Sequence, residues 1–259
     1  MKDTKRLLSY VRRGIDDYKM IEEGDKIAVG VSAGKDSLTL LCAMSELRRF
    51  YPIKFELVAI TIDMGFEGAD FSEIEKLCSE LDVEYHIVPS QISKIIFDIR
   101  KEKSPCSLCA KMRRGALHNA AKELGCTAVA LGHHFDDAVE TFMLNLFFEG
   151  RIGCFSPVSY LSRIGLRLIR PMVYMPEKDV RYFAAKNDLP VVKSSCPADG
   201  NTEREEMKKL LYELDRKHKG LRYRVFGAMQ RGEIDGFKEF GRLGGIEAYS
   251  DSDSDSSED

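Results

Sequence analysis

The sequence predicts an α/β protein with an open parallel sheet and helices on both faces. Short apolar runs of strand length alternate with longer segments of helical periodicity, which is typical of strands joined by crossover helices. Polar motifs follow several apolar runs, as expected where ligands bind at the carboxyl ends of parallel strands. The chain has 259 residues, 44% of them hydrophobic, which is enough for one large domain with a buried core.

The first half of the chain is read from its periodicity. The chain begins with apolar residues at helical spacing and with basic residues between them. This pattern ends at Gly24. Pro52 stops the next helix. The predicted elements are helix 4–21, strand 26–31, helix 36–50, strand 55–63, helix 70–82, strand 84–88 and helical segment 91–100.

The second half continues the alternation. The segment Ser104–Cys109 is followed by a helix to about Leu124, and Gly125 is a signal for its C-terminal end. Pro176 marks the start of a later helix. The remaining predicted elements are strand 127–131, a helix to Phe148, strand 166–170, a helix to Asn187, strand 190–193, and helices 203–219 and 221–231.

The segment Ser32-Ala33-Gly34-Lys35-Asp36-Ser37 lies between a predicted strand and a predicted helix. Small residues, the free N–H groups of a helix start, hydroxyl donors and one lysine suit a phosphate group. Gly30 and Gly34 are separated by three residues, so the segment is not a Walker A motif, which needs four. The alternative is a turn with a surface lysine. The segment resembles the signature of the PP-loop ATP pyrophosphatases, which cleave ATP between its α- and β-phosphates.

Ala33 departs from that signature, which usually has glycine at this position. An alanine is tolerated if its φ is negative, and it costs stability if φ is positive. The resemblance implies a PP-loop fold of the adenine nucleotide α-hydrolase, Rossmann-like type.

A second polar motif, from Gly132 and His133 to Asp136 and Asp137, follows the strand predicted at 127–131. Two adjacent carboxylates beside a phosphate loop suit Mg²⁺. The alternative for Asp137 is a helix N-cap with Glu140 three residues later. His133 is a candidate nucleotide contact because it directly follows a glycine at a strand end. Both interpretations can hold for different members of the pair.

Asp63 ends the second strand, where the adenosine part of a nucleotide would lie. The alternative is a turn acid before Gly65. Asp63 is therefore included as a candidate ATP contact.

The seven cysteines argue for thiols, metal binding or catalysis in a cytosolic protein. Cys106 and Cys109 form a Cys-x-x-Cys pair, and Cys196 is the best third partner because an irregular loop is predicted around it. Three thiolates satisfy three irons of a 4Fe–4S cluster and leave the fourth iron open. The alternatives are a redox pair or packed thiols. Of the other four cysteines, Cys42, Cys78 and Cys126 lie in or beside predicted elements and are expected in the core, whereas the sequence does not assign Cys154.

Several motifs in order resemble the TtcA family of tRNA 2-thiocytidine synthetases. They are Tyr18–Asp25, the loop at 32–37, Cys106–Gly115, Leu131–Asp137, Glu140–Asn145 and Ile169–Pro171. The resemblance covers about residues 4–205 and implies ATP-dependent thiolation of cytidine 32 in tRNA. It also implies a 4Fe–4S cluster on three cysteines and sulfur from a cysteine desulfurase. Cys106 and Cys109 correspond directly, and Cys196 corresponds less closely because its surrounding loop differs.

The resemblance gives the expected roles. The cofactors are ATP, Mg²⁺ and a 4Fe–4S cluster. The candidate catalytic residues are Lys35, Asp36, Asp137 and Arg113. The candidate ATP contacts are Ser32, Ala33, Gly34, Lys35, Asp36, Ser37, Asp63, Gly132 and His133. The candidate metal ligands are Cys106, Cys109 and Cys196 for the cluster, and Asp36 and Asp136 for Mg²⁺.

Four parts are expected along the chain. They are an N-terminal helix (1–24), a PP-loop ATPase domain with the cysteine site (25–202), a basic helical region (203–240) and a disordered acidic tail (241–259). The last nine residues carry five acids, and without them the formal charge of −3 becomes +2. The tail is read as solubilising, with shielding of a basic groove as the alternative.

The basic region 204–224 carries eight lysines and arginines against four acids, so it is a candidate tRNA-binding surface. A solvated helix face is the alternative, and core packing is expected for Tyr212, Tyr223 and Phe226. The expected partners are tRNA and a cysteine desulfurase or other sulfur donor, with a homodimer as a candidate assembly and no membrane partner.

A cytoplasmic location is expected, because no apolar run reaches the roughly 18 residues of a membrane span and the N-terminus lacks a signal peptide pattern.

Three other functions stay open from the sequence. Two are PP-loop enzymes acting on tRNA, a uridine 2-thiolase and a lysidine synthase. A lysidine synthase needs no cysteine triad, and uridine thiolases with clusters often carry additional Cys-x-x-Cys pairs. The third is a non-catalytic nucleotide- or iron–sulfur-binding protein, against which the intact Lys35, Asp36, Asp136 and Asp137 argue. A persulfide on one cysteine is the alternative to the cluster.

Overall fold

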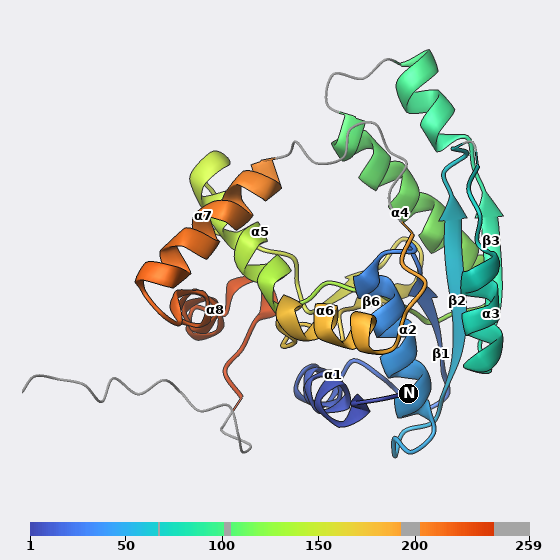
Figure 1. The fold of residues 1–259 in the computed structure, drawn as a ribbon, viewed down its shortest axis with the longest axis horizontal. Coiled ribbons are helices and arrows are strands. Elements are labelled where there is room, and N and C mark those ends of the chain that lie inside the picture. Colours follow the sequence, from blue (N-terminus) through green and yellow to red (C-terminus); the bar gives the residue numbers. More distant parts are fainter. Residues whose placement is uncertain (67, 101–104, 193–202, 241–259) are drawn as a thin grey trace, which may run out of the picture.

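A six-stranded sheet forms the centre of the protein. The computed structural model describes residues 1–66, 68–100, 105–192 and 203–240 (Figure 1). The strands follow the spatial order β3-β2-β1-β4-β6-β5, and every neighbouring pair is parallel except β5 with β6. This confirms the predicted parallel sheet. The strands are β1 (Asp25–Gly30), β2 (Phe55–Asp63), β3 (Glu84–Pro89), β4 (Ala128–Ala130), β5 (Val158–Leu161) and β6 (Leu166–Ile169).

Helices connect the strands and cover both faces of the sheet. Figure 1 shows α5, α7 and α8 together on one side of the molecule, with β3, α3 and α4 on the other. The helices are α1 (Thr4–Tyr18), α2 (Lys35–Arg48), α3 (Ser72–Glu80), α4 (Pro105–Glu123), α5 (Phe135–Phe148), α6 (Glu177–Lys186), α7 (Glu203–Lys217) and α8 (Leu221–Arg231). A π-helix, η1, spans Lys94–Ile99, and a short 3₁₀ turn, η2, spans Ile234–Gly236.

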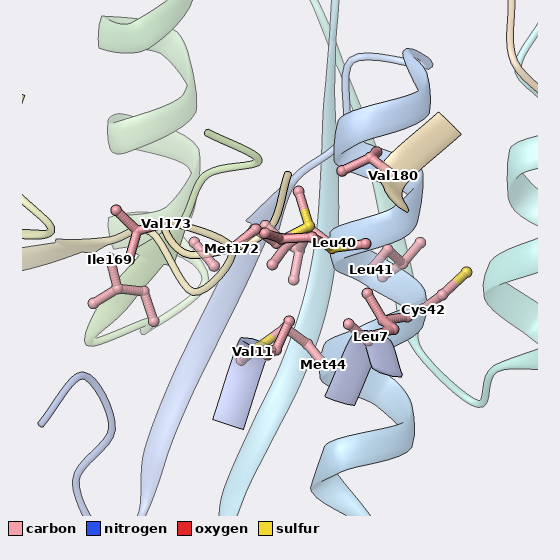
Figure 2. Packing of buried hydrophobic residues seen from close by; sticks show 14 of the residues in the cluster. Leu7, Val11, Leu40, Leu41, Cys42, Met44, Ile169, Met172, Val173 and Val180 are labelled. Atoms are coloured by element: carbon pink, nitrogen blue, oxygen red, sulfur yellow. The ribbon is translucent and has the colours of Figure 1, made fainter. Parts of the chain in front are cut away.

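The strand side chains alternate between two apolar cores. Ile27 and Val29 of β1 face one core, which they share with α1, α2 and α6, whereas Ala28 faces the other, with residues of α4 and η1. This period of two is the ordinary pleat of a strand buried on both faces. Figure 2 shows the first core, where Leu7 and Val11 of α1 lie near Leu40 and Met44 of α2.

Two predictions about the sheet edge were wrong. The strand expected at 190–193 is absent over residues 190–192, and the N–H of Val192 instead donates to the carbonyl of Ala33 at 3.0 Å. β5 was not predicted, and it pairs antiparallel to β6 at the edge of the sheet. Tertiary contact decided both cases. Lys193, Cys196 and the acidic tail lie outside the described residues.

The direction in which the chain adds strands to the sheet reverses between β1 and β4. From β1 the chain builds outward through β2 and β3, and then returns to add β4 on the other side of β1. Ligands of open α/β sheets bind beyond the carboxyl ends of the strands at such a reversal. The loop after β1 and the turn after β4 flank this point, so the fold brings the first two sequence motifs together.

Among the described helices, none is both long enough and apolar enough to cross a bilayer.

Candidate active site

The loop between β1 and α2 is wound around the hydroxyl of Ser37. This hydroxyl accepts from the N–H of Ser32 at 3.0 Å and donates to the carbonyl of Gly34 at 2.9 Å. Gly34 is the N-cap of α2 and makes no side-chain capping bond. The first amides of a helix have no partner within the helix, and here no side chain caps them from Gly34. The loop therefore has the form of an anion cradle, with Ser37 holding its shape.

Ala33 has a left-handed backbone, with φ at 60°. This conformation costs a non-glycine residue about 1–2 kcal/mol. The Ala33 side chain is buried in the larger core, which offsets part of that strain by about 0.8 kcal/mol for one buried carbon. The strain that the sequence left open is therefore present in the phosphate loop.

Lys35 lies between two carboxylates at the start of α2. Its Nζ is 3.1 Å from an Asp36 carboxylate oxygen and 3.3 Å from Oε1 of Glu177. Burial acts to lower the pKa of Lys35, but the charges of Asp36 and Glu177 outweigh it and the pKa is raised. Lys35 is therefore a fixed positive charge beside the loop.

Glu177, which the sequence analysis missed, is a hub for three cations. Its Oε1 is 2.9 Å from Nζ of Lys208 and 2.9 Å from a guanidinium nitrogen of Arg181, in addition to Lys35. Burial alone would raise its pKa, but these cations lower the pKa of Glu177 to about 2. The local sequence carries no signal for this role beyond a proline before the helix start.

The turn after β4 approaches the phosphate loop closely at Gly132. A Cβ at this position would lie 3.0 Å from the carbonyl carbon of Asp36 and 3.1 Å from the N of Ser37. Backbone atoms of the first turn of α2 cannot move aside as a flexible side chain would. The lack of a side chain at Gly132 therefore allows the turn after β4 to pack against the first turn of α2.

Gly132→Ala is expected to destabilise the fold by about 1–3 kcal/mol, because overpacking forces the first turn of α2 away from the turn after β4. We also expect weaker binding of a non-hydrolysable ATP analogue. Chemical unfolding and equilibrium binding measure the two effects. The control is Gly115→Ala within α4, where an added Cβ meets nothing within 4 Å. That variant should gain about 0.5–1 kcal/mol; equal behaviour of the two variants would contradict the packing argument.

The acids of the second motif are already engaged. Asp137 accepts from the N–H of His134 at 2.9 Å, and its other oxygen pairs with Arg204 at 3.0 Å. His134 is the N-cap of α5, and Asp137, the third residue of the helix, forms a capping box with it. The alternative that made Asp137 the N-cap, with Glu140 as its box partner, is therefore wrong, because the N-cap is His134, three residues before Asp137.

Asp136 is 3% exposed and joins three elements. Its carboxylate accepts from the N–H of Glu177 at 2.6 Å and pairs with Arg222 of α8. Asp36 is more open, with a side chain that is 33% exposed; its buried Oδ1 makes no hydrogen bond but lies 3.1 Å from Nζ of Lys35. Carboxylate oxygens are suitable Mg²⁺ ligands, and of these acids Asp36 has the most exposed side chain, but the described residues contain no cluster of three or more potential metal ligands.

Asp63 ends β2 and His133 follows β4, the two strands on either side of β1. Oδ1 of Asp63 accepts from the N–H of Gly65 at 2.9 Å, so the turn that the sequence offered as an alternative is formed. Nδ1 of His133 lies 3.3 Å from Nε of Arg170. Burial, together with the charge of Arg170, lowers the pKa of His133 to about 3, so this imidazole is neutral.

Glu140 is a buried acid that the sequence treated only as a capping partner. It is 6% exposed on α5. Burial, followed by the charges of Asp137 and Asp136, raises the pKa of Glu140 to about 7. The folded state therefore holds a proton that the unfolded chain releases above its ordinary pKa of about 4.3.

The stability that protonated Glu140 contributes is fully present below the pKa of this residue in the unfolded chain. It is lost as the pH rises through its folded pKa of about 7. Glu140→Gln is therefore expected to raise the free energy of unfolding at pH 8 by about 1–3 kcal/mol, with little gain at pH 4. Denaturant unfolding at both pH values measures it. Glu80→Gln, on the exposed surface of α3, is the control and should change little. A gain of equal size at both pH values would contradict the assignment.

Cys106 and Cys109 lie in the first turn of α4. Their spacing places both sulfurs on one helix face, and Arg113 follows one turn later. Cys106 is exposed and Cys109 is half-buried. Since α4 runs back to the start of β4, its first turn lies at the carboxyl edge of the sheet. Cys196 lies outside the described residues.

The other described cysteines are not exposed. Cys42, Cys78 and Cys126 are buried, which confirms the expectation of core thiols. Cys154 is half-buried, and its thiol donates to the carbonyl of Ala138 at 3.4 Å. Burial raises the pKa of Cys154 to about 12, so it is a thiol near neutral pH.

Several basic side chains of the C-terminal helices point into the site rather than outward. Arg204 pairs with Asp137, Lys208 with Glu177, and Arg222 with Asp136. These three cations were counted toward an RNA surface from the sequence. Phe226 is buried as expected, whereas Tyr212 is 61% exposed and was wrongly expected to pack in the core.

Comparisons with known proteins agree with this geometry. The family profile described as PP-loop domain matches residues 6–214. A tRNA-cytidine(32) 2-sulfurtransferase of Geobacter sulfurreducens is 40% identical over 228 residues, which cover 87% of this chain and 89% of the relative. The protein of the same name from Pseudomonas putida strain GB-1 is also 40% identical, with 87% and 83% covered.

Among solved structures, the U34-tRNA thiolase NcsA from Methanococcus maripaludis, with its 4Fe–4S cluster, is similar to this chain. The TM-score is 0.71 and the sequence identity 25%, over 88% of this chain and 79% of that one.

Proposed function

The chain belongs to the PP-loop family, and from this premise we propose that it is an ATP-dependent tRNA sulfurtransferase that converts cytidine 32 to 2-thiocytidine. The observation that carries the proposal is the combination of two groups at one edge of the sheet. A phosphate cradle with Lys35 follows β1, and the Cys106–Cys109 face opens α4. The first group suits cleavage of ATP, and the second suits delivery of sulfur.

The phosphate loop and Lys35 would bind the phosphates of ATP. The open amides of α2 and the charge of Lys35 are fixed before the reaction, so they stabilise charge that develops at the α-phosphate. Asp36 would hold Mg²⁺, which neutralises phosphate charge. Asp136 could become a second ligand only by giving up its ion pair with Arg222.

Two displacements convert the cytosine. The C2 oxygen attacks the α-phosphorus, the bond to the β-phosphate bridge breaks, and pyrophosphate leaves. A sulfur nucleophile then attacks C2, and AMP leaves with the former C2 oxygen. Arg113, one turn beyond Cys109, would face the phosphate of the adenylated base. Since C2 lies at the Watson–Crick edge, the target base must be unpaired.

The donor set at α4 is suitable for an iron–sulfur cluster. Cys106 and Cys109 would supply two thiolates and Cys196 the third. A 4Fe–4S cluster held there would leave one iron open for sulfur. A cysteine desulfurase is the proposed source of that sulfur. The alternative chemistry uses no cluster: one cysteine carries the sulfur as a persulfide and another cysteine resolves it.

Nucleoside mass spectrometry tests the proposal. Purified protein, reconstituted without oxygen, is incubated with unmodified tRNA, ATP, Mg²⁺ and sulfide. We expect 2-thiocytidine that maps to position 32, with one AMP and one pyrophosphate for each base converted. The likeness to NcsA favours uridine thiolation as the second candidate, which would give 2-thiouridine at position 34. No thiolated nucleoside would contradict both.

A further inference from the structure

Arg170 is a buried cation with no counter-charge among the residues that the structure describes. Arg170 directly follows β6 and is 7% exposed. No carboxylate among the described residues forms an ion pair with it. The other inward-facing arginines differ. Arg167, at the other end of the same strand, pairs with Glu22 and Asp25, and Arg222 pairs with Asp136 and Asp215.

Neutral groups hold Arg170 in place. Its Nε donates to Nδ1 of His133 at 3.3 Å, one terminal nitrogen donates to the carbonyl of Ser156 at 2.5 Å, and its guanidinium carbon lies 4.9 Å from the ring centroid of Phe155. These contacts fix the direction of the guanidinium. They do not neutralise it, because a histidine that accepts through Nδ1 is itself uncharged.

Further positive charge gathers around this point. The charges of Arg114 of α4 and Arg204 of α7 both lower the pKa of His133, and the charge of Arg114 also lowers the pKa of Arg170. Burying a charge is costly unless a partner is supplied. In a protein that pairs its other inward-facing arginines with acids, this exception indicates that the partner is a ligand.

The geometry points to a phosphate-binding subsite at Arg170, oriented by His133, and this inference rests on the proposed function. A guanidinium fork matches a phosphate in two parallel hydrogen bonds. β4 lies between β1 and β6, so Arg170 stands two strand spacings, about 10 Å, from the strand that carries the phosphate loop. The subsite therefore takes a second phosphate, either in the RNA backbone beside the target base or at the far end of ATP. The spacing favours the RNA phosphate.

Binding by full-length protein tests this subsite. Arg170→Met removes the charge at similar volume, and Arg170→Lys keeps the charge but loses the fork. We expect the Met variant to weaken tRNA binding by about tenfold or more and to reduce the salt slope by about one. The Lys variant should keep most of the slope but bind more weakly than the wild type, because it lacks the fork. Fluorescence anisotropy over a salt series, and equilibrium binding of a non-hydrolysable ATP analogue, give the two readouts.

The two arms identify the source of the phosphate. Loss in the tRNA arm assigns it to the RNA backbone, loss in the nucleotide arm assigns it to ATP, and unchanged affinity in both arms overturns the subsite. Arg167→Met is the matched control, because it should lower stability and leave both affinities unchanged. If the Met variant does not fold, the Lys variant decides, since unaltered binding by Lys in both arms also overturns the subsite. Binding that depends on Arg170 without any thiolation would reject only the proposed function.

Discussion

Lys35→Met is expected to lower the rate of thiolation by at least about 100- to 1,000-fold, the range seen when one charge-stabilising donor is removed from an active site. Lys35 is part of the phosphate loop, and its Nζ lies 3.1 Å from Asp36 and 3.3 Å from Glu177. Without it, the ATP phosphates would face these two carboxylates with one cation fewer. Release of AMP and formation of the thiolated nucleoside measure the effect.

Two comparisons make the Lys35 result specific. Lys35→Arg keeps the charge but changes its shape, so we expect partial activity. Lys208→Met removes another cation from Glu177 but does not alter the loop, so a milder loss is expected. A Lys35→Met protein that retains more than about a tenth of the wild-type rate would show that the loop does not act on phosphate as proposed.

Cys106→Ser and Cys109→Ser are each expected to abolish thiolation while leaving ATP binding intact. Both thiols lie on one face of α4, apart from the phosphate loop, so their loss removes sulfur chemistry without disturbing the ATP site. Iron and sulfide content after anaerobic reconstitution should fall with the activity. Nucleoside analysis and nucleotide binding are the two required measurements.

Cys126→Ala is the matched control for the cysteine variants. Cys126 is buried in the smaller core, so its loss should leave cluster content and thiolation near wild-type values. Full thiolation by protein that contains no iron would reject the cluster and favour the persulfide alternative.

Much of the fold could be predicted because its signals are local. Phe55–Asp63 was predicted with the bounds that β2 has, since a short segment composed mostly of apolar residues is typical of a strand buried on both faces. β5 was missed because its four residues are only partly buried and take their conformation from pairing with β6. The segment at 190–192 has strand-like residues, but its hydrogen bond goes to Ala33 rather than to the sheet.

The candidate site divides in the same way. The sequence by itself determined the phosphate loop and the Cys106–Cys109 pair, because each motif is complete within a few residues. Only the tertiary structure decided how charge is balanced, with Glu177 beside Lys35, Arg222 on Asp136, and no carboxylate from the described part of the chain on Arg170. The physical reason is that electrostatic energies depend on distance and burial, and neither is fixed until segments far apart in the chain have packed together.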